Sequence, residues 1–181
     1  MIDSRKDLQR YQTEDLAAHK LSKWRWSDRL RYPIVAYQRR LRYTEWVSNR
    51  RNAGRLWRVY RTYCRWRLAA TGMKMGLDIP PNVFGPGLSV RYGTIVVHPE
   101  SRVGARCRIH SGVCIGIKDG KVPRLGDDCY LGPGAKVYGG VVLGNKTKVG
   151  PNAVVNKSYP AGGAILVAPR HQAAVPVIRE D

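Results

Sequence analysis

Aliphatic residues recur at every sixth position over much of the second half of the chain. A helical period of 3.6 would scatter such positions around the helix axis, and a half-buried strand needs a period of two. Glycine and proline also recur too often for long strands. The positions are Val97, Val103, Ile109 and Ile115, then, after an interruption, Leu125, Leu131, Val137, Leu143, Val149 and Val155. The pattern therefore predicts a short structural repeat of six residues.

A six-residue repeat predicts a chain that turns a corner after each short extended segment. Each segment points one aliphatic side chain inward, and the next residue, often Gly, Asn or His, occupies the corner. Three segments make one coil, so that Val97 stacks on Ile115 and Leu125 stacks on Leu143. A single coil cannot bury its own apolar side, so stacked neighbours supply the core. We therefore predict a mainly β fold, a parallel β-helix with three flat faces.

The first part of the chain differs in composition from the repeat. Residues 1–72 contain 18 of the 32 Lys and Arg residues and all five Trp, in a chain whose formal net charge is +19. Residues 34–48 and 55–70 have the spacing of amphipathic helices, and Gly72 is the expected end of the second. The sequence therefore predicts a basic, aromatic α-helical region in front of the β-helix.

Interruptions of the repeat suggest the domain boundaries. The segment 117–124 breaks the six-residue frame and is expected to protrude as a loop, a kind of segment that often carries function. The expected division is a helical region over 1–72, a β-helix over 73–159 with this loop, and a C-terminal tail over 160–181.

The aromatic stripe of the two basic helices has three interpretations that the sequence leaves open. In the second helix, one face is marked by Leu56, Val59, Tyr60, Tyr63 and Trp66 or Arg67, and arginines flank it. The stripe could pack on the β-helix or on a sister chain. It could instead lie on an anionic membrane surface, as basic helices rich in Trp do. Nucleic-acid binding is the weakest interpretation, because charge alone supports it and no known reader motif is present.

The N-terminus, the apolar stretches and the cysteines indicate the cellular compartment of the protein. The charged N-terminus is not followed by an apolar run, so we expect no signal peptide. No stretch has the 18 or more apolar residues typical of a membrane span. Cys107, Cys114 and Cys129 fall within the coils, where a small thiol packs well, and no CxxC motif suggests a metal. A cytoplasmic location follows.

Several phrases of the chain resemble a known family. They are IPPNVFGPGL (79–88), GTIVV (93–97), CRIHSGV (107–113), LGPGAKVYG (131–139) and VGPNAVVNKSYP (149–160). They are similar to the serine O-acetyltransferases of the hexapeptide-repeat superfamily, and in particular to those encoded with bacterial polysaccharide genes. The resemblance implies a left-handed β-helix that assembles as a homotrimer. It also implies transfer of an acetyl group from acetyl-CoA, without a metal, to serine or to a sugar hydroxyl.

The resemblance also shows where this chain departs from the family. The family uses a His just before the GTIVV-like phrase as general base, because a hydroxyl is a poor nucleophile until its proton is removed. Here that position holds Arg91, or Tyr92 if the corner is counted from Val90. Arginine cannot act as a base near neutral pH. The second family His, before a Pro, is replaced by Val122, and Asp78 lies one residue from the expected acid.

Two other histidines are candidates for the missing base. His110 follows Tyr92 by three repeat units, so we expect it to stack one coil from the vacant position. His98 also follows an inward aliphatic residue but lies on a different corner. Either could equally be a corner residue bonded to backbone. His19 and His171 lie outside the repeat and are expected to be solvated.

Small corner residues are the candidates for binding the pantetheine arm of CoA. Gly134 and Ala135 come one coil before a similar corner that contains Gly150 and Ala153, and small corners leave room against the backbone. Tight corners require small residues in any case. Lys157 and Arg170 could meet the CoA phosphates.

The residues therefore allow three functions. The first is an acetyl-CoA-dependent O-acetyltransferase that acts on a small molecule or a glycan. The second is an inactive relative, a trimeric platform in which Arg91 blocks the site or binds an anion. The third is a basic module that binds nucleic acid or membrane.

Overall fold

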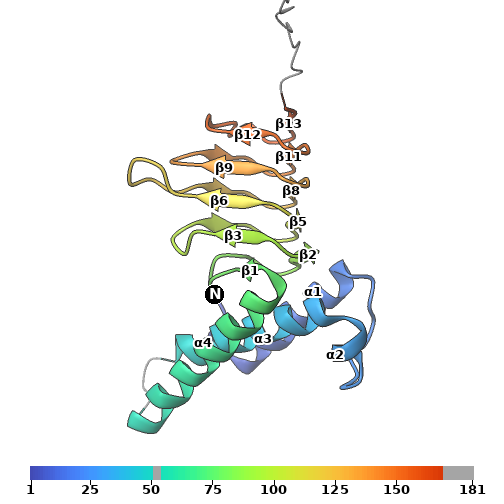
Figure 1. The fold of residues 1–181 in the computed structure, drawn as a ribbon, viewed down its shortest axis with the longest axis vertical. Coiled ribbons are helices and arrows are strands. Elements are labelled where there is room, and N and C mark those ends of the chain that lie inside the picture. Colours follow the sequence, from blue (N-terminus) through green and yellow to red (C-terminus); the bar gives the residue numbers. More distant parts are fainter. Residues whose placement is uncertain (51–53, 169–181) are drawn as a thin grey trace, which may run out of the picture.

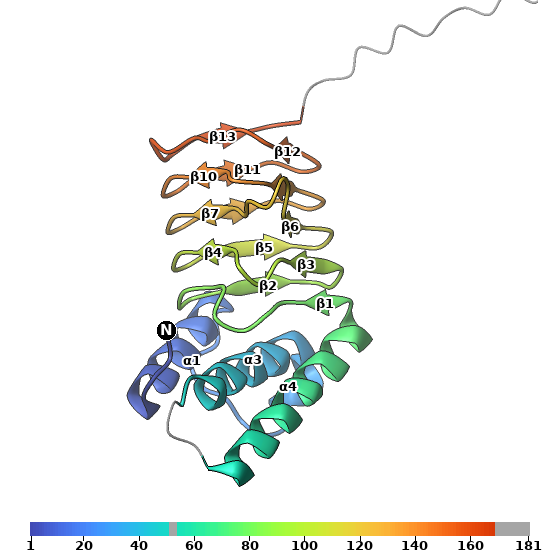
Figure 2. The ribbon, with the colours of Figure 1, turned by 90° about the vertical axis from the view of Figure 1, so that its left-hand side faces the viewer.

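The structure, a computed structural model, describes residues 1–50 and 54–168. A parallel β-helix forms one end of the molecule, and helices cover the first coil at the other end (Figures 1 and 2). Arg170 and His171 lie outside the described residues. The predicted fold, a β-helix preceded by a helical region, is confirmed.

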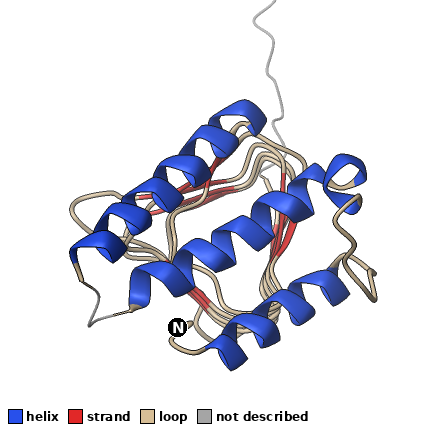
Figure 3. Ribbon diagram, turned by 90° about the horizontal axis from the view of Figure 1, so that it is seen from below, coloured by secondary structure: helices blue, strands red, loops and turns tan. Residues whose placement is uncertain are grey.

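Four helices form the helical region, and local signals define their ends. They are α1 (Arg5–Ala18), α2 (Asp28–Arg31), α3 (Pro33–Asn49) and α4 (Arg55–Met75). Ser4 and Asp7 form a capping box at the start of α1, and Pro33 occupies the first turn of α3. Viewed from below, α1, α3 and α4 lie across the end of the β-helix (Figure 3).

The expected end of α4 at Gly72 is wrong. The helix continues to Met75, and Gly76 ends it in the left-handed conformation, with φ of 65°. Gly72 has a packing role instead, because a Cβ there would clash with the carbonyl oxygen of Leu77. The glycine lets α4 approach the first strand closely.

The coils form three parallel sheets, one on each face of the prism. Face A contains β1 (Leu77–Asp78), β3 (Ile95–Val97), β6 (Cys114–Gly116), β9 (Lys136–Tyr138) and β12 (Val154–Val155). Face B contains β4 (Arg102–Val103), β7 (Arg124–Leu125) and β10 (Val142–Leu143). Face C contains β2 (Ser89–Arg91), β5 (Arg108–His110), β8 (Tyr130–Leu131), β11 (Lys148–Val149) and β13 (Ile165–Leu166). This architecture is consistent with the left-handed β-helix.

The aliphatic ladders predicted from the repeat are present. Val97 pairs with Ile115, and Leu125 pairs with Leu143, each across one coil. These side chains are buried in one continuous core that also includes Cys107. The six-residue period therefore identified the inward positions correctly.

The segment 117–124 forms a tight hairpin on the side of the β-helix. Lys118 and Lys121 exchange two backbone hydrogen bonds of 3.0 Å, and both residues between them have positive φ, 51° at Asp119 and 69° at Gly120. An Asp-Gly pair of this kind is typical of a two-residue hairpin turn. Residues 117–121 are exposed, so the segment protrudes as expected (Figure 1).

Polar and apolar contacts join the helical region to the first coil. Tyr37 and Leu41 of α3 belong to the same core as the coils. Arg42 is fully buried and donates hydrogen bonds to the carbonyl oxygens of Phe84 and Gly85, at 2.9 and 2.6 Å. The two regions therefore share one core and one buried polar network.

Candidate active site

Arg91 and His110 are neighbours on face C. They are register partners of β2 and β5. Val90 and Ile109, which precede them, point into the core, so Arg91 and His110 point outward. The ring of His110 also meets the ring of Tyr130 on the next coil, with centroids 5.2 Å apart. A base candidate, a cation and an aromatic side chain therefore share one outer surface.

The expected stacking of His110 on Tyr92 is wrong. The register pairs His110 with Arg91, because the coil from Val90 to Ile109 holds one residue more than three repeat units. The additional residue lies in the corner between β2 and β3. Tyr92 occupies that corner with its side chain 71% exposed. Of the two candidates for the vacant family position, Arg91 is the one that faces His110.

The surroundings of His110 keep its imidazole neutral. Partial burial, followed by the positive charges of Arg108 and Arg91, lowers the pKa of His110 below its ordinary value. A neutral imidazole can accept a proton, whereas a charged one cannot. The arrangement therefore suits a general base.

The corner beside this site has an unusual backbone. Tyr92 and Thr94 both have positive φ, 68° and 64°, and a β-branched residue rarely adopts this conformation. Gly93 lies between them, and a Cβ there would clash with the carbonyl oxygen of Met75. The end of α4 therefore presses directly on the corner, and strain of this kind is often found at functional sites.

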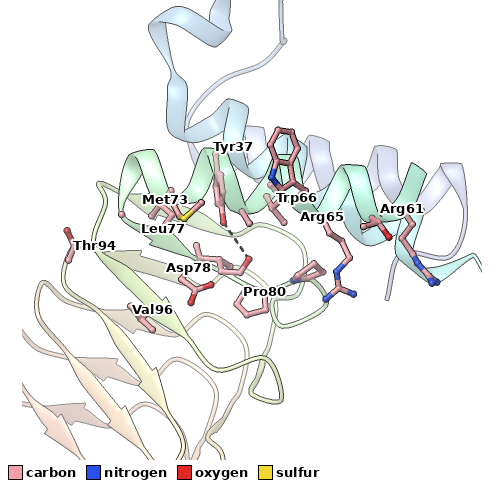
Figure 4. A pocket seen from close by; sticks show the side chains of 16 residues that line it. Tyr37, Arg61, Arg65, Trp66, Met73, Leu77, Asp78, Pro80, Thr94 and Val96 are labelled. Carbon is pink, nitrogen blue, oxygen red and sulfur yellow. Dashed lines mark hydrogen bonds between the residues drawn. The ribbon is translucent and has the colours of Figure 1, made fainter. Parts of the chain in front are cut away.

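Asp78 lies on a different face from Arg91 and His110. It lines a groove of about 1010 Å³ between α4 and face A, opposite Arg65 and Trp66 (Figure 4). Strand β1, which carries Asp78, pairs with β3. The structure therefore does not pair this carboxylate with His110.

The other histidines have local roles. His98 follows β3, and its Nδ1 accepts a hydrogen bond of 3.3 Å from the backbone N–H of Glu100. The expectation of a solvated His19 is wrong, because its Nε2 lies 2.6 Å from Oε1 of Gln38 in a partly buried site. Burial lowers the pKa of His19. Gln38 in turn bonds the backbone of Leu88 and Val90.

The small corner residues proposed for CoA are explained largely by packing. The side chains of Ala135 and Ala153 are buried in the core. A Cβ at Gly134 would clash with Oδ1 of Asn152, whereas a Cβ at Gly150 would lie 3.1 Å from the nearest atom. These residues can shape a surface for a ligand but cannot offer side chains to it.

Lys157 lies beside a cavity at the far end of the β-helix. The cavity has a volume of about 270 Å³ and is lined by Lys157, Val154 and Ile165, among others. Val154 and Ile165 are largely exposed, at 62% and 70%. An exposed cation next to apolar side chains fits a ligand that joins phosphates to an apolar arm, as CoA does.

Sequence reasoning missed two residues of the His110 surface, Arg108 and Tyr130. They are register partners of β5 and β8, on a coil that the hairpin at 117–124 makes longer than three repeat units. Regular one-coil offsets do not lead to Tyr130, whereas Arg108 lies two residues before His110 on β5 and follows from the alternation of side chains along a strand. The length of the interruption between Ile115 and Leu125 could have revealed the pairing.

Comparison with known proteins identifies the repeat. A family model described as "Bacterial transferase hexapeptide (six repeats)" matches residues 123–157. The serine acetyltransferase of Mycobacterium tuberculosis is 32% identical over 130 residues, which cover 68% of this chain and 57% of that protein. The chain is a hexapeptide-repeat protein similar to serine acetyltransferases.

Solved structures agree with this hexapeptide-repeat fold. Serine acetyltransferase isoform 3 of Entamoeba histolytica, in complex with cysteine, has a TM-score of 0.68 at 18% identity, covering 96% of this chain and 62% of that one. A serine acetyltransferase in complex with CoA has a TM-score of 0.62 at 22% identity, covering 86% and 65%. This hexapeptide-repeat protein thus spans less than two thirds of the length of these relatives.

The described residues of this hexapeptide-repeat protein contain neither a group of metal ligands nor a membrane-crossing helix. Within residues 1–50 and 54–168, no three His, Cys, Asp or Glu side chains group as metal ligands would. In the same part of the chain, no helix has the length and apolar character needed to cross a membrane.

Proposed function

We propose that this protein is an acetyl-CoA-dependent O-acetyltransferase that acts on serine or on a sugar hydroxyl in polysaccharide biosynthesis. The observation that carries the proposal is the pairing of Arg91 with His110 on face C. The similarity to serine acetyltransferases supports the reaction class, and a relative of that class binds CoA.

His110 is the proposed general base. Its imidazole takes the proton of the acceptor hydroxyl as the hydroxyl oxygen attacks the acetyl carbon. The lowered pKa of His110 keeps it ready for this step near neutral pH. His98 is the second candidate for the base, and Tyr92 would contact the acceptor rather than move protons. Asp78 lies on face A and has no proposed contact with an acceptor held at His110.

Arg91 has a separate proposed role. Its guanidinium cannot take a proton but can donate several hydrogen bonds. It would stabilise the negative oxygen that develops when the hydroxyl attacks, which is the largest electrostatic demand of acyl transfer. It would also hold a negatively charged group of the acceptor.

Acetyl-CoA supplies the activated acetyl group, which leaves sulfur and joins the hydroxyl oxygen, and free CoA thiol is released. Lys157 would bind its phosphates beside the cavity at the end of the β-helix. The corners at Gly134, Ala135, Gly150 and Ala153 would provide a smooth surface for its arm. We propose that the working form is a homotrimer, in which the β-helix of a neighbouring subunit covers this surface and so encloses the bound CoA.

We further propose a cytoplasmic protein that contacts an anionic membrane through its basic helical region, where lipid-linked glycans would be presented. The charge of the segment 1–72, with 18 Lys and Arg against six Asp and Glu, supports this contact.

Release of CoA thiol from acetyl-CoA tests the proposal. The purified protein would be incubated with L-serine and with a panel of sugar acceptors. Acceptor-dependent release supports an O-acetyltransferase, and loss of release in His110→Ala with CoA binding intact supports the assigned base. No release with any acceptor from folded protein that still binds CoA would favour the inactive platform, in which Arg91 blocks the site.

A further inference from the structure

Helix α4 has a second apolar face that the fold leaves uncovered. One side of the helix packs inward through Cys64 and Leu68, which are buried. The rest of the helix surface carries large exposed side chains, and we name this surface the outer face of α4. It consists of Leu56 (87% exposed), Val59 (66%), Tyr60 (39%), Tyr63 (47%), Trp66 (63%) and Met73 (77%). Packing against the chain's own β-helix therefore does not explain these residues.

Aromatic rings along α4 contact one another in series. Ring centroids of Trp57 and Tyr60 lie 5.7 Å apart, those of Tyr60 and Tyr63 lie 6.4 Å apart, and those of Tyr63 and Trp66 lie 6.2 Å apart. These contacts join Tyr60, Tyr63 and Trp66 of the outer face into one aromatic surface. Large aromatic side chains suit the boundary between water and lipid.

The charges carried by α4 itself have one sign, and the nearest acidic side chain is that of Asp78 across the groove from Arg65 and Trp66. No Asp or Glu occurs between Glu45 and Asp78. The basic residues of α4 are Arg55, Arg58, Arg61, Arg65, Arg67 and Lys74. Long basic side chains beside an apolar face can reach lipid phosphates while their stems remain on the apolar surface.

We propose that α4 lies on an anionic lipid surface, with its outer face in the headgroup region and its arginines on the phosphates. This deepens the membrane contact of the proposed function by assigning the surface that makes it. Charge favours a membrane over a second copy of the chain. A contact between two α4 helices would bring two groups of six cations together with no acidic residue from either helix to compensate them.

Vesicle sedimentation of the full-length protein tests the assignment. The protein is mixed with vesicles of phosphatidylcholine alone or with about one third phosphatidylglycerol, at about 0.1 M salt. We expect binding only to the anionic vesicles. Arg58→Gln with Arg65→Gln should weaken it about 30-fold, since each cation near the surface contributes about 1 kcal/mol. Leu56→Ser with Val59→Ser and Trp66→Ser should weaken it about tenfold or more.

Matched controls separate the outer face of α4 from general charge and hydrophobicity. Arg124→Gln with Lys146→Gln removes two exposed charges from the β-helix, and Val142→Ser with Val154→Ser removes two exposed apolar side chains there. These variants should bind vesicles like the parent. Equal losses in the control and α4 variants would overturn the assignment, as would no binding to anionic vesicles at low salt.

Two further outcomes are decisive. If the α4 variants dissociate an oligomer while the parent ignores vesicles, the outer face is an interface between copies and the proposal fails. If acetyl transfer to a soluble acceptor is absent but vesicle binding follows the expected pattern, the membrane surface stands while the proposed activity fails. Vesicle binding needs no turnover, so the two failures are distinguishable.

Discussion

Nε of Arg42 lies 2.8 Å from Oδ2 of Asp15, and both side chains are almost completely withdrawn from water. The pair joins α3 to α1. Asp15 also accepts a hydrogen bond of 2.8 Å from the backbone N–H of Leu88, and Arg42 bonds Glu45 and two carbonyl oxygens of the first coil. The buried cation is therefore well supplied with acceptors, and the network couples the helices to the β-helix.

Asp15→Ala should destabilise the protein by about 3 kcal/mol, because it removes one of the two carboxylates that pair with buried Arg42 and leaves the backbone N–H of Leu88 without its acceptor. Urea unfolding followed by circular dichroism measures this change. Asp3→Ala removes an exposed carboxylate nearby in sequence and serves as the control. Similar unfolding midpoints for the two variants would show that the pair does not couple the regions.

His110→Ala should lower acetyl transfer about 10²- to 10⁴-fold, the range that a positioned general base contributes. CoA binding should be unchanged, because His110 lies on face C and away from Lys157. His98→Ala is the matched control and should retain most activity, since the imidazole of His98 accepts its hydrogen bond from Glu100 in its own corner. The reverse pattern would move the base to His98.

The pH dependence of acetyl transfer should report the environment of His110. Burial and the charges of Arg108 and Arg91 lower its pKa, so activity should fall only below the ordinary pKa of a histidine. Arg108→Gln removes one of those charges. The pKa of His110 should then rise, and the acidic limb of the kcat/KM profile should move to higher pH. A limb that moves to lower pH, or stays in place, would contradict the electrostatic role of Arg108.

Gly134→Ala should destabilise the β-helix more than Gly120→Ala. Both glycines have positive φ, 71° and 69°, so the backbone cost of about 1 kcal/mol is common to both. A Cβ at Gly134 would clash with Oδ1 of Asn152, whereas a Cβ at Gly120 meets nothing within 4 Å. Thermal unfolding of the two variants measures the difference. An equal loss of stability in the two variants would show that the side chain of Asn152 moves away from the new Cβ without an energetic cost.

Thr94→Gly should stabilise the protein by about 1 kcal/mol, because it relieves a β-branched residue from the left-handed conformation. Thr147→Gly is the control, since Thr147 is buried and does not have positive φ, and it should destabilise the protein. Chemical denaturation compares the variants. Destabilisation by Thr94→Gly would mean that the threonine side chain contributes more than its backbone strain costs.

The six-residue period predicted the β-helix and its inward residues. Each face has one column of aliphatic side chains, and burying that column allows few alignments of one coil on the next. Local signals also located α3 and most of α4. The end of α4 was misplaced because a glycine is typical of a helix end. Gly72 instead lets α4 pack closely on Leu77, and this tertiary contact leaves no signal in the local sequence. His19 was misjudged for the same reason, since its partner Gln38 belongs to another helix.

The sequence by itself determined the repeat, the basic front of the chain and the absence of a histidine at the position of the family's base. Only the tertiary structure decided that Arg91, rather than Tyr92, faces His110, because one additional residue in a corner shifts the register of that coil. It also decided that the aromatic side of α4 is uncovered, since the helix packs inward through Cys64 and Leu68 instead. The period of the sequence specifies which residues share a face. Inserted residues and the packing of helices decide which other side chains, if any, that face contacts.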